Sequence, residues 1–357
     1  MAMRRNMYFR KFNHKVKPLS AILLGFMLNA CQTTPSDPAP DVKHIDIQLK
    51  INRFEQDFFA LDTSDIASGL KKLQTTYGEF ADIYFTRIVP AFDPRIAANG
   101  PEAYIKGFIS HPEIQKLNAI CSEKYKDFDP WEKAFVQTFK YLRHYFPDIP
   151  TPELTTFISE YSLGCFIYKE QSLAIGLDFF LGADYPYQKF NPENPNFSQY
   201  LTRTFNDEHL VLKTLLPLVA DLAGPPPGEK LLDHIIHNGK QLLVLEKLLP
   251  QVPDSILMEV TSAQAEWLSS NEKNIWAFFL SEDLLYNSDW QKIRKYVEYS
   301  PGSPGMPAEA PGRTGNWIGW QIAKAYLKKY PSTTLPALLA LNDSQEFLRR
   351  SGYKPPR

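Results

Sequence analysis

Three short β-rich runs follow one another in residues 154–177, which read LTTFISEYSLGCFIYKEQSLAIGL. The runs cover residues 154–159, 164–168 and 173–177, and polar or glycine-containing turns separate them. Branched and aromatic residues in short runs bounded by such turns favour β-strands. We therefore expect a small β-sheet in the middle of the chain.

Helical patterns lie on both sides of these runs. Their apolar residues recur every three to four positions, which is the spacing of a helix that buries one face. The predicted helices cover residues 65–89, 101–109, 114–124, 130–145, 207–222, 231–249, 261–268, 271–279 and 317–329. Residues 45–51 alternate apolar and polar side chains and predict one more half-buried strand. The expected fold class is α+β, predominantly helical, with a small sheet followed by long helices.

The start of the chain has the charge pattern of an export signal. Its first 18 residues contain six Lys or Arg and no acidic residue. The apolar run at residues 19–30 is too short for a membrane-spanning helix, which needs about 20 residues. Ala30 directly before Cys31 resembles the lipobox of bacterial lipoprotein precursors. We therefore predict a signal peptide at residues 1–30 and acyl chains on Cys31 that hold the mature protein on a membrane.

The mature chain then divides into a tether and a single domain. Residues 31–43 contain Pro35, Pro38 and Pro40 among small polar residues, a composition that stays extended and solvated. Residues 44–357 contain neither an internal repeat nor a low-complexity boundary, so we expect one globular domain there.

Two features bear on location and partners. Gln32 stands where an aspartate would resemble an inner-membrane retention signal, so we expect an outer-membrane protein that faces the periplasm. The whole chain carries 39 basic and 40 acidic residues, and six of the basic ones lie in the signal peptide. The mature chain therefore has a net charge of −7, which argues against nucleic-acid binding.

Two cysteines remain in the mature chain, Cys121 and Cys165. The periplasm is oxidising and would permit a disulfide between them if their Cα atoms lie within about 7 Å. Two buried free thiols are the alternative, and the sequence leaves both possibilities open.

His234 and His237 lie one turn apart on the helix predicted at residues 231–249 and share a face of it. Such a pair could bind a metal ion, with Glu272 or Glu266 as a third ligand. However, a hydrolytic zinc helix usually spaces its histidines four residues apart and places a glutamate after the first. This helix has neither feature. We therefore expect no metal and no other cofactor, and the histidines and Glu272 stay weak candidates.

Residues 300–316 contain four prolines and four glycines and predict a long loop, and loops of this length are often functional. Arg313, Trp317 and Trp320 lie in or beside this loop. Arginine and tryptophan are enriched where proteins bind one another, so these residues predict an exposed partner surface. Buried packing of the two tryptophans is the alternative.

Three sets of residues carry a recognisable pattern over nearly the whole mature chain. They are residues 51–59, residues 175–185, and a third set made of Gly239-Lys240, Trp267 and residues 271–276, 311–313, 316–322 and 351–355. Their order and spacing resemble the gliding-motility lipoprotein family GldB of the Bacteroidetes.

The resemblance implies a cell-envelope lipoprotein that is required for surface gliding and linked to type IX secretion. It also implies a distant similarity to zincin-type metallopeptidases, with a metal site that has decayed here. The leading hypothesis is a non-enzymatic structural or assembly component whose partners are other gliding and secretion proteins of the envelope. The alternative is a divergent metal-dependent peptidase that uses His234, His237 and Glu272 or Glu266.

Overall fold

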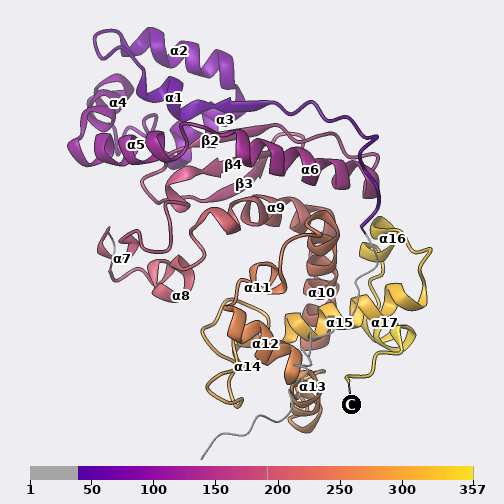
Figure 1. Ribbon diagram of the computed structural model, residues 1–357. Helices are drawn as coiled ribbons and strands as arrows, with labels where there is room; N and C mark the ends of the chain where they lie inside the picture. The colour runs from indigo at the N-terminus through magenta and orange to yellow at the C-terminus, as the bar shows by residue number, and fades with distance from the viewer. Residues whose placement is uncertain (1–38, 191, 357) are drawn as a thin grey trace, which may run out of the picture. The chain divides into compact units, whose positions relative to one another are not determined.

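The computed structural model describes residues 39–190 and 192–356 (Figure 1). Its four-stranded sheet consists of β1 (Ile51–Arg53), β2 (Leu154–Phe157), β3 (Cys165–Tyr168) and β4 (Ser172–Gly176). The strands are ordered β1-β2-β4-β3, with β1, β2 and β4 parallel and β3 antiparallel at one edge. The three β-rich runs therefore form strands, as expected.

The strand predicted at residues 45–51 pairs only at its end. Its exposure alternates as expected, with Ile47 buried between exposed neighbours, but pairing with β2 begins at Ile51. Strand β2 begins at Leu154, and Pro150 and Pro152 before it have no N–H group to donate. These prolines limit the hydrogen-bonded pairing between β1 and β2 to the residues from Leu154 onward.

The first helices of the chain cover one face of the sheet (Figure 1). The helices between β1 and β2 are α1 (Phe54–Phe59), α2 (Ile66–Tyr77), α3 (Glu79–Ile83), the π-helix Tyr84–Ile88, α4 (Pro101–Ser110), α5 (Pro112–Lys124) and α6 (Asp129–Tyr145). Phe54 and Phe58 of α1 are fully buried in a cluster with Phe80 and Tyr84. Ala174 of β4 reaches the same cluster, so this aromatic core attaches α1 to α4 to the sheet, whereas α5 and α6 contribute to the core on the opposite face.

The helix predicted over residues 65–89 is interrupted at Gly78. This glycine has a φ of +49°, a left-handed value that other residues rarely adopt. Helix α2 therefore ends at Tyr77, and α3 begins at Glu79. The other predicted N-terminal helices agree with α4, α5 and α6 to within two residues.

The opposite face of the sheet packs on α9. Leu173 and Ile175 of β4 lie in one core with Leu215 and Leu218 of that helix. The elements after β4 are the 3-10 turns Leu177–Phe179, Pro195–Phe197 and Arg294–Tyr296, and the helices α7 (Tyr187–Phe190), α8 (Gln199–Thr202), α9 (Asp207–Ala223), α10 (Leu231–Leu248), α11 (Asp254–Leu257), α12 (Ser262–Ser270), α13 (Glu272–Ser281), α14 (Trp290–Ile293), α15 (Thr314–Lys329), α16 (Leu335–Leu339) and α17 (Ser344–Ser351).

The long C-terminal helices lie close to their predicted bounds. Helices α9, α10, α12 and α13 differ from the predictions by at most two residues at either end, whereas α15 begins three residues earlier than expected. Among the described residues, no helix is both long and apolar enough to cross a membrane.

Helices α10 and α15 cross at two glycines. A Cβ atom on Gly319 would lie 1.8 Å from the Ile235 carbonyl oxygen, and one on Gly239 would lie 2.0 Å from the Gly319 carbonyl carbon. Real side chains never come this close, so only glycine allows these backbones to approach. Lys240, next to Gly239, is buried and donates to the carbonyls of Leu339 (3.0 Å), which ends α16, and of Leu341 (2.8 Å) just after it.

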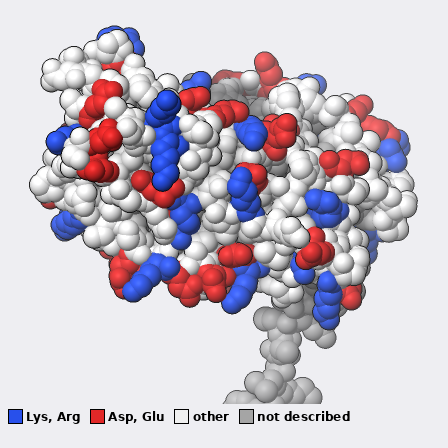
Figure 2. Space-filling model, turned by 90° about the horizontal axis from the view of Figure 1, so that it is seen from above, with Lys and Arg blue, Asp and Glu red and all other residues white. Residues whose placement is uncertain are grey.

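Several predictions concern residues outside the described ranges. The signal peptide at residues 1–30, Cys31 and most of the tether at residues 31–43 belong to them. Residues Pro40–Arg357 form one compact unit. Basic and acidic side chains are interspersed on the face of the molecule seen in Figure 2.

Candidate functional site

The weak metal candidates are not brought together. The His234 ring lies 5.0 Å from the Trp290 ring, while His237 Nε2 accepts a hydrogen bond from Gln241 Nε2 at 2.7 Å. Glu272 instead accepts from the Tyr353 hydroxyl at 2.8 Å. Within residues 39–190 and 192–356, no group of three or more His, Cys, Asp or Glu side chains is placed to hold a metal ion. The ligand set of the peptidase hypothesis, with Glu266 included, is therefore not assembled.

The expected partner surface at Arg313, Trp317 and Trp320 is wrong, because all three residues are buried. Their exposed fractions are 8%, 4% and 0%. The Trp320 indole N–H donates to Glu246 Oε2 at 2.7 Å, and the two tryptophan rings pack edge to face. The alternative of buried packing holds for both tryptophans.

The two cysteines are free thiols in the structure. Cys121 is fully buried in α5, and burial raises its pKa far above the ordinary value. Cys165 of β3 lies on the sheet face toward α9, where its Sγ is 3.7 Å from Thr214 Oγ1. Each thiol is thus used in packing, and the disulfide that the sequence left open is not formed.

Arg313 instead belongs to a buried ion cluster around Glu259. Glu259 lies in the turn after α11 and pairs with Lys213 of α9 and with Arg313, whose Nη1 is 3.4 Å from Oε2. The Tyr299 hydroxyl donates to the same carboxylate, and the Arg313 guanidinium stacks 4.3 Å from the Tyr299 ring. Burial alone would raise the pKa of Glu259, but the two cations outweigh it and lower the pKa to about 2.

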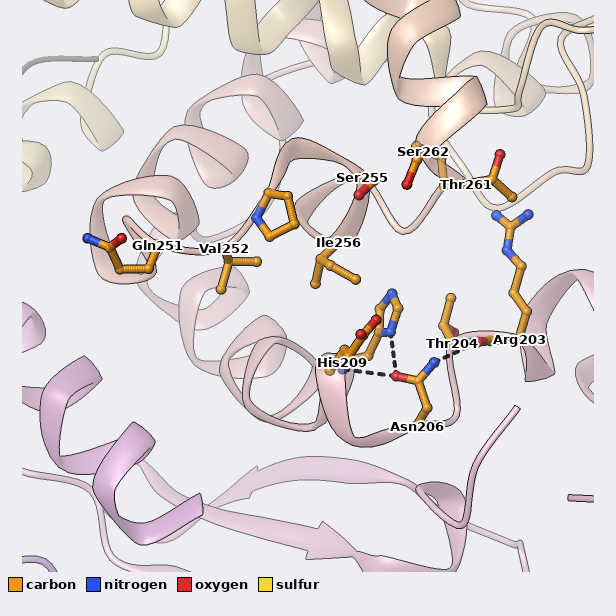
Figure 3. A pocket seen from close by; sticks show the side chains of 13 residues that line it. Arg203, Thr204, Asn206, His209, Gln251, Val252, Ser255, Ile256, Thr261 and Ser262 are labelled. Carbon is orange, nitrogen blue, oxygen red and sulfur yellow. Dashed lines mark hydrogen bonds between the residues drawn. The ribbon is translucent and has the colours of Figure 1, made fainter. Parts of the chain in front are cut away.

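A cavity of about 590 Å³ lies beside this cluster, between the start of α9, α11 and the start of α12 (Figure 3). We call it the α9–α12 cavity. Its lining includes Arg203, Thr204, Asn206, Glu208, His209, Gln251, Val252, Pro253, Ser255, Ile256, Val260, Thr261 and Ser262. One wall is thus apolar and the rest is polar.

His209 is the unusual residue of the α9–α12 cavity. It is only 6% exposed, and its Nδ1 lies 2.8 Å from Asn206 Oδ1. No described group donates to or accepts from its Nε2, although that atom is buried. Burial lowers the pKa of His209 to about 4, so the ring is neutral near pH 7.

Sequence reasoning missed this cavity. Asn206 and His209 resemble an ordinary helix start, because Asn206 is a capping residue whose Oδ1 accepts from the His209 backbone N–H. The opposite wall, residues 251–262, is distant in the sequence and contains no motif. The only local signal was a histidine at the buried side of a helix start, and that signal is weak.

The α9–α12 cavity contains side chains that could bind a small ligand. It offers a cation in Arg203, a neutral imidazole in His209, hydroxyl groups and an apolar wall. A few convergent polar groups beside apolar surface are typical of ligand sites.

The comparisons with known proteins give one match. The family model described as gliding motility protein GldB matches residues 35–355. No curated protein and no solved structure matches the chain. Because the matched region covers nearly the whole chain, the protein belongs to the gliding motility protein GldB family.

Proposed function

We propose that this protein is a lipid-anchored component of a gliding machinery in the cell envelope, with a non-enzymatic role in assembly that is linked to type IX secretion. The family match over residues 35–355 is the observation that carries the proposal. The buried positions of Arg313, Trp317 and Trp320 support a structural role for residues that resemble the family. The same holds for Gly239 and Lys240 at the crossing of α10 and α15.

In this proposal the lipid anchor of the protein is attached to Cys31. The basic first residues, the short apolar run and Ala30 before Cys31 support export followed by lipidation. We place the mature protein at the outer membrane, facing the periplasm of a member of the Bacteroidetes, because of Gln32 and the family resemblance. A distant zincin-like ancestry with a decayed site is part of the proposal, since a small sheet precedes α10.

Complementation tests the role in gliding. We would express the chain in a gliding relative that lacks its own GldB, and measure spreading on agar and release of type IX cargo. The unmodified chain is expected to restore both. A His234→Ala, His237→Ala double variant should restore them equally, because neither histidine lies in an assembled metal site. Failure of the double variant, with a folded protein at normal amount, would favour the peptidase alternative.

Lipidation is tested separately with Cys31→Ser. This variant should lose its acyl chains and leave the membrane fraction, because several acyl chains supply the membrane affinity. Ser36→Cys in the same tether serves as a matched control and should keep the protein on membranes. Membrane fractionation of Cys31→Ser like that of the unmodified chain would contradict the anchor.

A further inference from the structure

We propose that the α9–α12 cavity binds an acylated amino acid with a free carboxylate, the chemistry found at the carboxy-terminal end of a protein chain. The inference goes beyond the scaffold role, and it depends neither on the lipid anchor nor on gliding. Three observations carry it: an unpartnered acceptor at His209, an arginine without a carboxylate partner at Arg203, and an apolar wall in the same cavity.

The tautomer of His209 follows from its neighbour. Asn206 Oδ1 also accepts from the His209 backbone N–H, while Asn206 Nδ2 donates to the Arg203 carbonyl at 2.9 Å. These contacts fix the amide orientation, so Oδ1 faces the ring and His209 Nδ1 carries the proton. Nε2 of the neutral ring is then an acceptor. In Figure 3 the ring extends from α9 toward Ile256, into the cavity.

An acceptor at this place needs a donor from the ligand. The groups of the described residues that line the cavity leave Nε2 without a hydrogen bond, although buried polar atoms are nearly always paired. A peptide N–H group supplies such a donor without bringing a positive charge close to Arg203. This favours an amide over an ammonium group on the ligand.

Arg203 supplies the anion-binding part. Its Nη2 donates to the Glu259 carbonyl at 2.7 Å and its Nη1 to Gln264 Oε1 at 3.4 Å, which leaves other N–H groups of its five donors for a ligand. Among the described residues, Glu259 forms its ion pairs with Lys213 and Arg313, and no carboxylate pairs with Arg203. An arginine with this fork geometry is suited to a carboxylate.

The charge of the surroundings agrees with an anionic ligand. Lys213 and Arg313 pair with the buried carboxylate of Glu259, Arg203 donates to the backbone carbonyl of the same residue, and Glu208 lies exposed at the rim of the cavity. These three cations outnumber the two carboxylates of Glu259 and Glu208. Val252, Pro253, Ile256 and Val260 line the apolar wall, where the side chain of a terminal apolar residue would pack.

The test compares matched ligands on the full lipidated chain in detergent, by calorimetry at pH 7. The probes are N-acetyl-leucine, an acetylated pentapeptide that ends in leucine, and the carboxamide of each. We expect both carboxylates to bind at least tenfold more tightly than their amides. A pentapeptide that binds tenfold better than N-acetyl-leucine identifies a protein chain end as the source, and equal affinities identify a free acylated amino acid.

Variants test the named residues. His209→Phe keeps a ring in place but removes the acceptor, and it should weaken carboxylate binding at least tenfold. His44→Phe changes an exposed histidine elsewhere and should leave binding unchanged. Equal binding of carboxylates and amides, no binding at millimolar concentration, or full affinity in His209→Phe would each overturn the proposal. If His209→Phe does not fold, the comparison of each carboxylate with its amide on the unmodified chain still tests the proposal.

Discussion

Charged residues in the core depend on their partners. Arg313 and Glu259 are 8% and 2% exposed, and each would be costly to bury alone. Glu259 has a φ of +50° and Arg313 a φ of +58°, so both hold left-handed backbone conformations. The cluster with Lys213 and Tyr299 thus ties the turn after α11 and the start of α15 to α9.

Removal of one partner should therefore destabilise the protein. In Arg313→Met the side chain keeps much of its bulk, but Glu259 loses one of its two cations. We expect the free energy of unfolding to fall by about 3 to 5 kcal/mol. Urea denaturation measures this change.

The control is Arg349→Met. Its ion pair with Glu346 lies at the surface, where the Arg349 side chain is 74% exposed. Exposed ion pairs contribute little, so the urea midpoint should not move. Equal effects of the two substitutions would contradict the assignment of Arg313 to a buried cluster.

One glycine on each of the two long C-terminal helices determines how closely the helices approach each other. Gly239 of α10 and Gly319 of α15 occupy the crossing point, where backbone atoms touch directly. Helical periodicity predicts each helix but not this contact, because it reports one buried face and not the neighbour that covers it. Gly239 and Lys240 belong to the residues that resemble the family, and in the structure Gly239 allows the helices to pack while Lys240 binds the carbonyls at the end of α16.

Gly319→Ala should separate the helices. Its Cβ would lie 1.8 Å from the Ile235 carbonyl oxygen, which is backbone and cannot rotate away. We expect a loss of about 3 kcal/mol or more, seen as a large fall in Tm or in soluble yield.

Gly107→Ala is the matched substitution in α4. Nothing lies within 4 Å of its Cβ position, and Gly107 is exposed inside a helix. This change should stabilise the protein by roughly 0.5 to 1 kcal/mol. A Gly319→Ala protein with unchanged Tm would show that α10 and α15 do not cross at these glycines.

His209, His237 and Asp178 are buried groups whose shifted pKa values bear on the stability of the whole molecule in acid. Burial lowers the pKa of His209 and of His237 to about 4. Burial also raises the pKa of Asp178 to about 6, although backbone N–H groups of Tyr161 and Ser159 oppose it. The histidines and the aspartate act on stability in opposite directions.

Acid should destabilise the protein between pH 6.5 and 4. In this window the unfolded histidines bind protons that the folded ones do not, so unfolding becomes easier as the pH falls. Folded Asp178 takes up a proton below about pH 6, which the unfolded chain does only near 4, so it opposes this loss. Two histidines outweigh one aspartate, and we expect a net loss on the order of 3 kcal/mol.

Urea midpoints at several pH values measure the net effect. Asp178→Asn removes the opposing group and should make the acid loss steeper, whereas His44→Phe, at an exposed histidine, should not change the slope. Stability that rises from pH 6.5 to 4 would contradict the assignment of these pKa shifts.

The local elements of this protein can be predicted from neighbouring residues alone. Spacing predicts the long helices to within a few residues, and the β-rich runs predict β2, β3 and β4, because period and turn residues are properties of neighbouring positions. The break at Gly78 escaped this reasoning, since a helical pattern continues across a single glycine. The family resemblance likewise depends on the order and spacing of short stretches of the chain.

The contacts between residues distant in the sequence become visible only in the folded protein. Arg313 looked like an exposed contact residue, yet it is buried against Met258, Glu259 and Tyr299. His209 and Ile256 belong to separate elements and share a cavity only after the chain folds. Such contacts depend on how whole helices pack, and this packing follows from the fit of many side chains. No single position in the sequence therefore predicts them.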